Sequence, residues 1–214
     1  MKYGTGRTGS IRSTIFERGI HVGAGFWLLL AAALTVSPAA VTLAVLLAAA
    51  AHEGGHLLAL RRFGVPVESV RLGAMGAVIR APGANRLSYG RELWVTLAGP
   101  AVNLLCAPTL AAISSRRGWD WGLLFAGAHA VLGVYNLLPI APLDGARALY
   151  LMVACVFGPT AGERASRGVS LTAALALTAL GACLALRRGA VLFLFAALGL
   201  LLPQIRLAET ERSV

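Results

Sequence analysis

Long apolar runs, separated by short polar segments that contain arginine, dominate the pattern of this chain. A helix needs roughly 17–25 predominantly apolar residues to cross the hydrocarbon core of a bilayer. Six segments meet this criterion or approach it: 20–36, 39–60, 92–114, 121–143, 169–186 and 189–203. The pattern therefore predicts an all-α polytopic membrane protein with about six transmembrane helices.

The segment from Val65 to Ala81, between the second and third of these runs, has a different pattern. Residues 67–72 and 77–80 are β-prone and flank Gly73-Ala74-Met75-Gly76, a sequence typical of a tight turn. We expect a short β-hairpin here, inserted into an otherwise helical chain.

Composition supports the membrane assignment. Apolar residues make up 57% of the 214 residues and charged residues 13%, and the mean hydropathy of +0.75 lies far outside the range of soluble globular proteins. No segment has the composition of a separate soluble domain. We expect one integral membrane domain over 1–214, with C-terminal helices at about 169–203.

The formal net charge of +10 raises the possibility of nucleic-acid binding, but the distribution of the charge argues against it. A cytoplasmic N-terminus followed by six crossings places 15 of the 19 lysines and arginines in the cytoplasm. By the positive-inside rule, this predicts cytoplasmic N- and C-termini. A cleavable signal peptide ending near Ser37-Pro38-Ala39-Ala40 is a competing interpretation, which the long basic N-terminal segment disfavours. In the arrangement with six crossings, the four basic residues on the far side of the membrane are Arg116, Arg117, Arg187 and Arg188.

His52-Glu53-Gly54-Gly55-His56 interrupts the second apolar run. Two imidazoles and a carboxylate are costly at this depth and indicate a functional site. On a helix, residues i and i+4 share one face, so His52 and His56 can bind one metal ion, while Glu53 handles a proton. The neutral imidazoles are the ligands, so acid should release the metal.

A catalytic zinc takes three protein ligands, so a third must come from elsewhere in the chain. Among the nine acidic residues, only Glu53 and Asp144 have strongly apolar surroundings. Asp144 lies three residues before Arg147, and the histidine motif ends five residues before Arg61, so both groups lie at similar depth near the cytoplasmic side. The alternative is that Asp144 only caps a helix or a turn.

Two prolines precede Asp144. Pro139 and Pro142 each lack a backbone donor and disfavour a continuous helix. We expect a kinked or extended segment that frees the Asp144 carboxylate to turn towards the metal. Irregular backbone at membrane depth is tolerated where it lines a cavity or packs on protein.

Three motifs now resemble one family. His52-Glu-Gly-Gly-His56, Ala98-Gly-Pro-Ala-Val-Asn103 and Asn136-Leu-Leu-Pro-Ile-Ala-Pro-Leu-Asp144-Gly are similar to those of site-2 protease intramembrane metalloproteases, above all the compact group around stage IV sporulation protein FB. The resemblance covers residues of about 40–150, the expected catalytic core. It implies a zinc ion bound by His52, His56 and Asp144, with Glu53 as the catalytic base.

The resemblance also implies a bacterial cell membrane, a membrane-tethered protein substrate and a re-entrant hairpin between helices two and three. A membrane-tethered transcription factor, its anti-factor or a signal-peptide remnant would fit as substrate, cut near the cytoplasmic end of its spanning segment. The exposed edge of the hairpin could bind unwound substrate as an added strand. Unlike larger relatives, this sequence predicts no PDZ or CBS domain.

Asn103 and Asn136 are tentative substrate-binding or oxyanion residues. Asn103 could hydrogen-bond the substrate backbone or the developing oxyanion, or equally link helices as polar residues in membranes commonly do. For Asn136, a structural or substrate-contact role is preferred to direct catalysis. His129 lies about four helical turns from Asp144, too far to share its metal, and is expected to be packed.

Two other functions fit parts of the pattern. A membrane-anchored zincin that cuts soluble segments would use a glutamate as third ligand, but the later glutamates all lie in loops or at helix ends. A non-proteolytic zinc-binding protein or a transporter is the alternative from another class. A transporter would need polar groups along a path through the bilayer, whereas here they cluster near one face.

Overall fold

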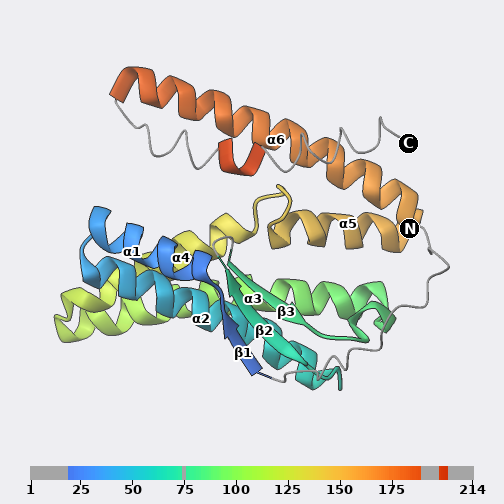
Figure 1. Ribbon diagram of the computed structural model, residues 1–214, viewed down its shortest axis with the longest axis horizontal. Helices are drawn as coiled ribbons and strands as arrows, with labels where there is room; N and C mark the ends of the chain where they lie inside the picture. The colour runs from blue at the N-terminus through green and yellow to red at the C-terminus, as the bar shows by residue number, and fades with distance from the viewer. Residues whose placement is uncertain (1–18, 74–75, 189–197, 202–214) are drawn as a thin grey trace.

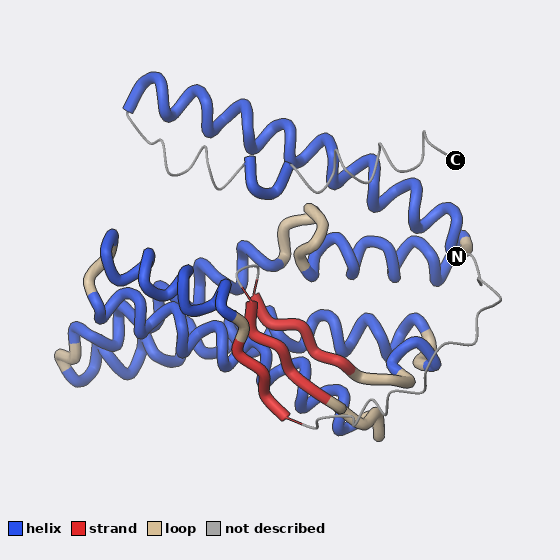
Figure 2. Tube along the Cα trace, viewed as in Figure 1, coloured by secondary structure: helices blue, strands red, loops and turns tan. Residues whose placement is uncertain are grey.

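The computed structural model describes residues 19–73, 76–188 and 198–201. Within these ranges, six principal helices accompany a small three-stranded sheet (Figures 1 and 2). The helices are α1 (Ala24–Val36), α2 (Ala39–Arg62), α3 (Tyr89–Arg117), α4 (Asp120–Asn136), α5 (Asp144–Phe157) and α6 (Pro159–Arg188). The strands are β1 (Gly19–Val22), β2 (Ser69–Gly73) and β3 (Gly76–Arg80), and a 3₁₀ turn follows at Ala84–Arg86.

Helix α3 is central, because α2, α4 and α5 all pack against it. Figure 1 shows α4 and α5 following one another along α3, with the loop 137–143 between them. Pro139 and Pro142 lie in this loop and interrupt the helical path, as the sequence predicts. The loop brings Asp144 to the middle of the molecule, where α2 and α3 also pass.

Helix α6 lies along α5 at the upper side of Figure 1. Small residues allow this close approach: a Cβ atom at Gly162 would lie 2.8 Å from the carbonyl oxygen of Tyr150 and 2.9 Å from the Cβ of Ala154. The loop 137–143 also contacts α6, since Ile140 packs in a buried cluster with Ala174 and Leu200. The loop between α4 and α5 is thus packed against α6.

The predicted hairpin is confirmed, because β2 and β3 pair antiparallel, with Val70 opposite Ile79. The sequence missed a third strand. Residues 20–22 were expected to begin the first membrane helix, but Gly19–Val22 forms β1, which pairs parallel to β2. The amide of Gly23 then donates to the carbonyl of Leu72, and the helix starts only at Ala24. The sheet order β1–β2–β3 leaves β3 at an edge, and the fold is mostly helical rather than all-α.

Three of the described helices are long and apolar enough to cross a bilayer: α2, α3 and α6. The six predicted spans are therefore not established. Helix α1 has 13 residues, and the predicted span 121–143 ends as a helix at Asn136. The predicted span 169–186 is part of the longer α6, and most of the predicted span 189–203 lies outside the described residues.

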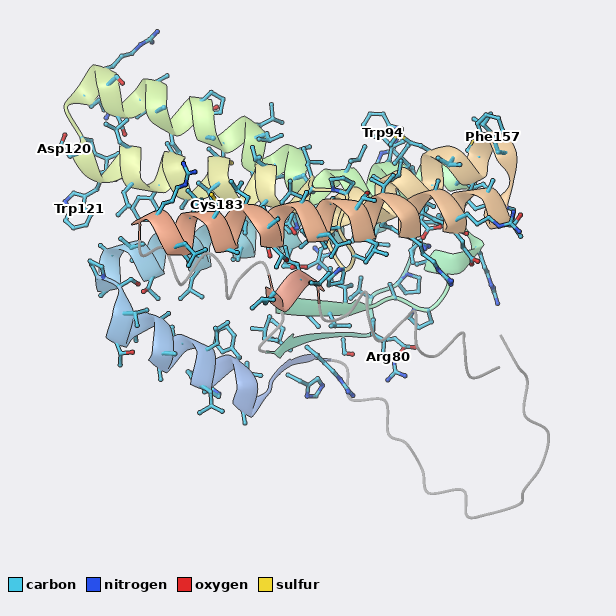
Figure 3. All side chains as sticks on the ribbon, turned by 90° about the horizontal axis from the view of Figure 1, so that it is seen from above. Arg80, Trp94, Asp120, Trp121, Phe157 and Cys183 are labelled. Atoms are coloured by element: carbon cyan, nitrogen blue, oxygen red, sulfur yellow. The ribbon has the colours of Figure 1, made fainter. Side chains whose placement is uncertain are left out.

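The molecular surface has the character expected of a lipid-facing protein. Large apolar side chains are widely exposed, among them Leu105 at 69%, Val131 at 71% and Leu186 at 88%. In Figure 3, Trp94 and Trp121 lie towards opposite ends of the helical bundle. Tryptophan is enriched at both membrane–water interfaces, so this placement agrees with an apolar zone between the two residues.

Candidate active site

His52 and His56 lie one turn apart on α2, on the face that packs against α3. His52 is 5% exposed, and the two Nε2 atoms are 3.2 Å apart. The helices approach closely here because of two glycines. A Cβ atom at Gly55 would lie 2.6 Å from the carbonyl oxygen of Ala98, and one at Gly99 would lie 2.4 Å from Nε2 of His56. The imidazoles therefore occupy space that any side chain at position 99 would fill.

The orientation of His56 is fixed by the backbone of α3. Its Nδ1 lies 2.8 Å from the carbonyl oxygen of Val95. A carbonyl can only accept, so Nδ1 carries the proton, and in the neutral imidazole Nε2 presents a lone pair. This arrangement is the usual orienting contact of metal-binding histidines.

Asp144 is the first residue of α5, and the loop before it brings the carboxylate to the histidine pair. Its Oδ2 lies 3.0 Å from Nε2 of His52 and 3.4 Å from Nε2 of His56. The structure thus brings together the three ligands predicted from sequence segments 88 residues apart. The sequence places Asp144 at the end of the predicted span 121–143. In the structure, α4 ends at Asn136 and Asp144 instead starts α5.

The spacing of the three atoms fits a metal ion. Ligands held 2.0–2.1 Å from a tetrahedral ion lie about 3.3 Å from one another. The observed separations are 3.0, 3.2 and 3.4 Å. Asp144 Oδ2 is buried and lacks a hydrogen bond of good geometry in the described structure, despite its nearness to both imidazoles. With Nδ1 of His56 protonated, its Nε2 and the Asp144 carboxylate both present lone pairs to the same point. A cation between them would offset their repulsion, so the residues present fit a bound metal.

A cavity of about 520 Å³ opens beside the cluster. Glu53 lines it together with the three ligands, and so does Asn136, the last residue of α4. The side-chain nitrogen of Asn136 donates to the carbonyl oxygen of Leu132, 3.0 Å away. The side-chain oxygen of Asn136 takes no part in this bond and can accept from another donor. Strand β3 contributes Ala77 and Ile79 to the lining. The cavity therefore joins the metal-binding cluster to apolar side chains and to further polar ones, among them Glu92, Thr96 and Tyr135.

Asn103 lies elsewhere. It is fully buried between α3 and α4, and its Oδ1 accepts a hydrogen bond from Nδ1 of His129, 3.0 Å away. Asn103 is not among the residues that line the cavity. This contact matches the interhelical role more closely than contact with substrate, and it gives His129 its partner.

The contact of His56 with the carbonyl of Val95 was missed from the sequence, whereas close helix packing at Gly99 was predictable. A backbone acceptor has no sequence signal. Gly99 had one, because it lies in a Gly-Pro pair inside an apolar helix, where glycine often permits close packing.

Comparisons with known proteins bear on the fold and on the class of the protein. No family model matches the chain. A solved structure, the site-2 protease from Methanocaldococcus jannaschii, superposes with a TM-score of 0.67 at 20% identity, over 89% of this chain and 91% of that one. The fold is that of a site-2 protease. This likeness in fold agrees with the resemblance seen in the three motifs.

Sequence relatives carry consistent names. The chain is 36% identical over 107 residues to the protein named zinc metalloprotease Rip3 of Mycobacterium tuberculosis, over 45% of this chain and 26% of that protein. It is 24% identical over 135 residues to zinc metalloprotease MJ0392 of Methanocaldococcus jannaschii, over 61% and 39%. It is 29% identical over 136 residues to stage IV sporulation protein FB of Bacillus subtilis, over 62% and 47%.

The matched region thus covers less than half the length of each of these relatives. Together with the apolar helices, the site-2 protease fold indicates an integral membrane protein.

Proposed function

We propose that this chain is an intramembrane zinc metalloprotease that hydrolyses a peptide bond in or near the spanning segment of a membrane-tethered protein. The convergence of His52, His56 and Asp144 within a cavity among apolar helices carries the proposal. The names of the relatives support zinc as the metal.

The residues present divide the work of peptide hydrolysis between them. Zinc held by the three ligands would supply a Lewis acid that activates water and polarises the scissile carbonyl. Glu53 lines the same cavity and takes the proton from the attacking water, then returns it to the leaving amine. Asn136 is positioned at the cavity wall to hydrogen-bond the substrate backbone. The apolar helices limit the access of bulk water to the reacting groups.

Substrate binds along β3 in this proposal. A helical segment has its amides already paired, so the scissile region must be unwound before hydrolysis. Strand β3 is an edge strand whose Ala77 and Ile79 face the cavity, and an extended segment added to it would pass beside Glu53. The unwound amides would then be satisfied by the strand instead of by the lost helix.

Proline substitutions test strand addition. Neighbouring residues of a strand direct their amides to opposite edges, so of Val78→Pro and Ile79→Pro one removes a bond to β2 and the other alters only the free edge. We expect the free-edge variant to lose cleavage of a spanning substrate while keeping zinc. Unchanged cleavage by both variants would rule out strand addition.

The orientation follows from charge. With a cytoplasmic N-terminus, Arg61 and Arg62 lie at the cytoplasmic boundary, and His56 is five residues, about 7.5 Å along the helix, inside it. The active site therefore lies towards the cytoplasm, and the cut falls near the cytoplasmic end of the substrate's spanning segment. The membrane in this proposal is a bacterial cell membrane.

The decisive experiment compares the wild-type chain with Glu53→Gln in detergent. Both are assayed for zinc content and for cleavage of a panel of single-span substrates. We expect zinc in both and cleavage by the wild type alone, because glutamine keeps the shape of the side chain but cannot take a proton. Glu68→Gln, in the loop before β2, is the matched control and should cleave normally.

The competing function is a non-proteolytic zinc-binding protein or transporter. It predicts zinc binding in all three proteins and cleavage by none of them. Absence of zinc from the wild-type protein would contradict both functions.

A further inference from the structure

None of the three motifs includes α6, yet α6 makes side-chain hydrogen bonds to the backbone on both sides of Asp144. Small residues recur on one face of α6 at intervals of four: Gly162, Ser166, Ser170 and Ala174. This face packs on α5 and on the loop 137–143.

Ser170 bonds the loop at two points. It is 1% exposed, its Oγ donates to the carbonyl oxygen of Pro139 at 3.0 Å, and the same oxygen accepts from the amide of Ala141 at 3.2 Å. One hydroxyl thus spans the backbone on both sides of Ile140. Within the loop, the amides of Ile140 and Leu143 bond to nearby backbone carbonyls, whereas the two bonds of Ser170 tie the loop to another helix.

Two further contacts complete the attachment. Ile140, between the two bonded groups, is 2% exposed and packs against Ala174, one turn further along α6. Ser166, one turn earlier, donates to the carbonyl oxygen of Ala146 at 3.0 Å, two residues after Asp144. Asp144 is therefore bracketed by contacts to α6 on both sides in sequence.

The metal-binding cluster shows why this attachment matters. The separations of 3.0 and 3.4 Å between Asp144 Oδ2 and the two histidines depend on the position of the loop, since the histidines belong to α2 and have their own support from α3. A shift of about 1 Å is enough to misplace a functional group.

We propose that Ser170, assisted by Ser166, is a positioning residue that holds Asp144 in register with the two histidines, so that α6 sets the metal affinity of a site to which it contributes no ligand. This inference rests on the proposed metal function. It assigns a specific role to a helix outside the region that carries the motifs.

The test measures Zn²⁺ affinity of the purified full chain in detergent by competition with a chelator. We expect Ser170→Ala to weaken affinity about tenfold, the lower end of the range typical for residues that orient metal ligands. Ser166→Ala should have a smaller effect. The matched control is Thr178→Ala, because the Thr178 hydroxyl lies on the same helix but bonds only the carbonyl of Ala174 within α6. It should bind zinc as the wild type does.

A second readout separates positioning from general stability. Co²⁺ bound in place of zinc reports its ligand set by visible absorption, and Ser170→Ala should shift that spectrum towards the spectrum of Asp144→Ala. In the Asp144→Ala background, Ser170→Ala should cause no further loss of affinity. Should Ser170→Ala not fold, Ser170→Cys keeps a donor on a slightly larger side chain, donates a weaker hydrogen bond and should also weaken affinity.

Wild-type affinity and an unchanged cobalt spectrum in a folded Ser170 variant would overturn the inference while leaving the metal site intact. A lowered unfolding temperature with unchanged zinc affinity would do the same, since it would show a purely structural role. A wild-type chain that binds no zinc would overturn the proposed function as well, so the two failures are distinguishable.

Discussion

The two histidines lie on one uninterrupted helix, whereas the aspartate starts a helix that follows a proline-containing loop. His52 and His56 are fixed by the regular spacing of α2, by close packing on Gly99 and by the carbonyl of Val95. Asp144 depends on contacts that its own segment cannot make: the hydroxyls of α6 and the packing of Ile140. A metal-binding side chain on a continuous helix is thus supported by its own helix and that helix's immediate packing, whereas one that follows a loop needs support from a distant element.

The largest expected effect is the loss of the aspartate itself. Asp144→Asn keeps the size of the side chain but removes the anionic ligand, so zinc affinity should fall by more than about 100-fold, beyond the cost of losing a residue that only orients a ligand. Chelator competition measures the change. Asp120→Asn, which alters the first turn of α4 instead, should leave zinc affinity unchanged, and equal losses in both variants would contradict this assignment.

Gly145→Ala tests whether the position of Asp144 depends on the close packing of the backbone beside it. The added Cβ would lie 2.2 Å from the carbonyl oxygen of Leu137 and 2.5 Å from that of Leu138. Backbone atoms cannot rotate away, so we expect a loss of stability of roughly 1–3 kcal/mol or more, together with weakened zinc binding. Thermal unfolding and chelator competition measure the two effects.

Gly90 supplies the control for that substitution. It also lies in the first turn of a helix, but a Cβ there would meet nothing within 4 Å. Gly90→Ala should therefore leave both quantities near wild type, and a loss as large as that of Gly145→Ala would show that the crowding at Leu137 is not the cause.

Gly99→Ala tests the packing of α3 against His52 and His56. It should change zinc affinity more than it changes stability. Its Cβ would meet imidazole atoms of His56 and His52 at 2.4 and 2.9 Å, and side chains can rotate where backbone cannot. We expect zinc affinity to fall about 10–100-fold with a smaller loss of stability than for Gly145→Ala. Gly127→Ala, at a helical position with open space around it, is the control. A greater loss of stability than of zinc binding would reverse the proposed distinction.

The smallest expected effect concerns the ion pair between Glu92 on α3 and Arg147 on α5. Nε of Arg147 donates to Glu92 at 3.1 Å, and the guanidinium also lies 4.8 Å from the ring centroid of Tyr150. The Arg147 side chain is 52% exposed, so the pair should contribute at most about 1 kcal/mol. A double-mutant cycle with Glu92→Gln and Arg147→Met, followed by thermal unfolding, measures this coupling. A coupling of several kcal/mol would make the ion pair a principal support of α5, the helix that begins with Asp144.

Much of the site was predictable because its chemistry is concentrated in short sequence patterns. The spacing of His52 and His56 fixes one helical face, and an aspartate with strongly apolar sequence neighbours after two prolines is conspicuous. The β-hairpin was predictable from its turn. Strand β1 was not, because Ile20 and Val22 read equally well as the start of a membrane helix, and only the unpaired edge of β2 decides between the two.

The sequence by itself determined the apolar class of the protein, the candidate ligands and the break before Asp144, because hydropathy, helical spacing and proline geometry act over a few residues. The tertiary structure decided which groups support those ligands. The fit of Gly99 against the imidazoles, the pairing of Asn103 with His129 and the hold of Ser170 on the loop each join residues far apart in the chain. Such contacts depend on how whole helices pack, and no local pattern encodes them.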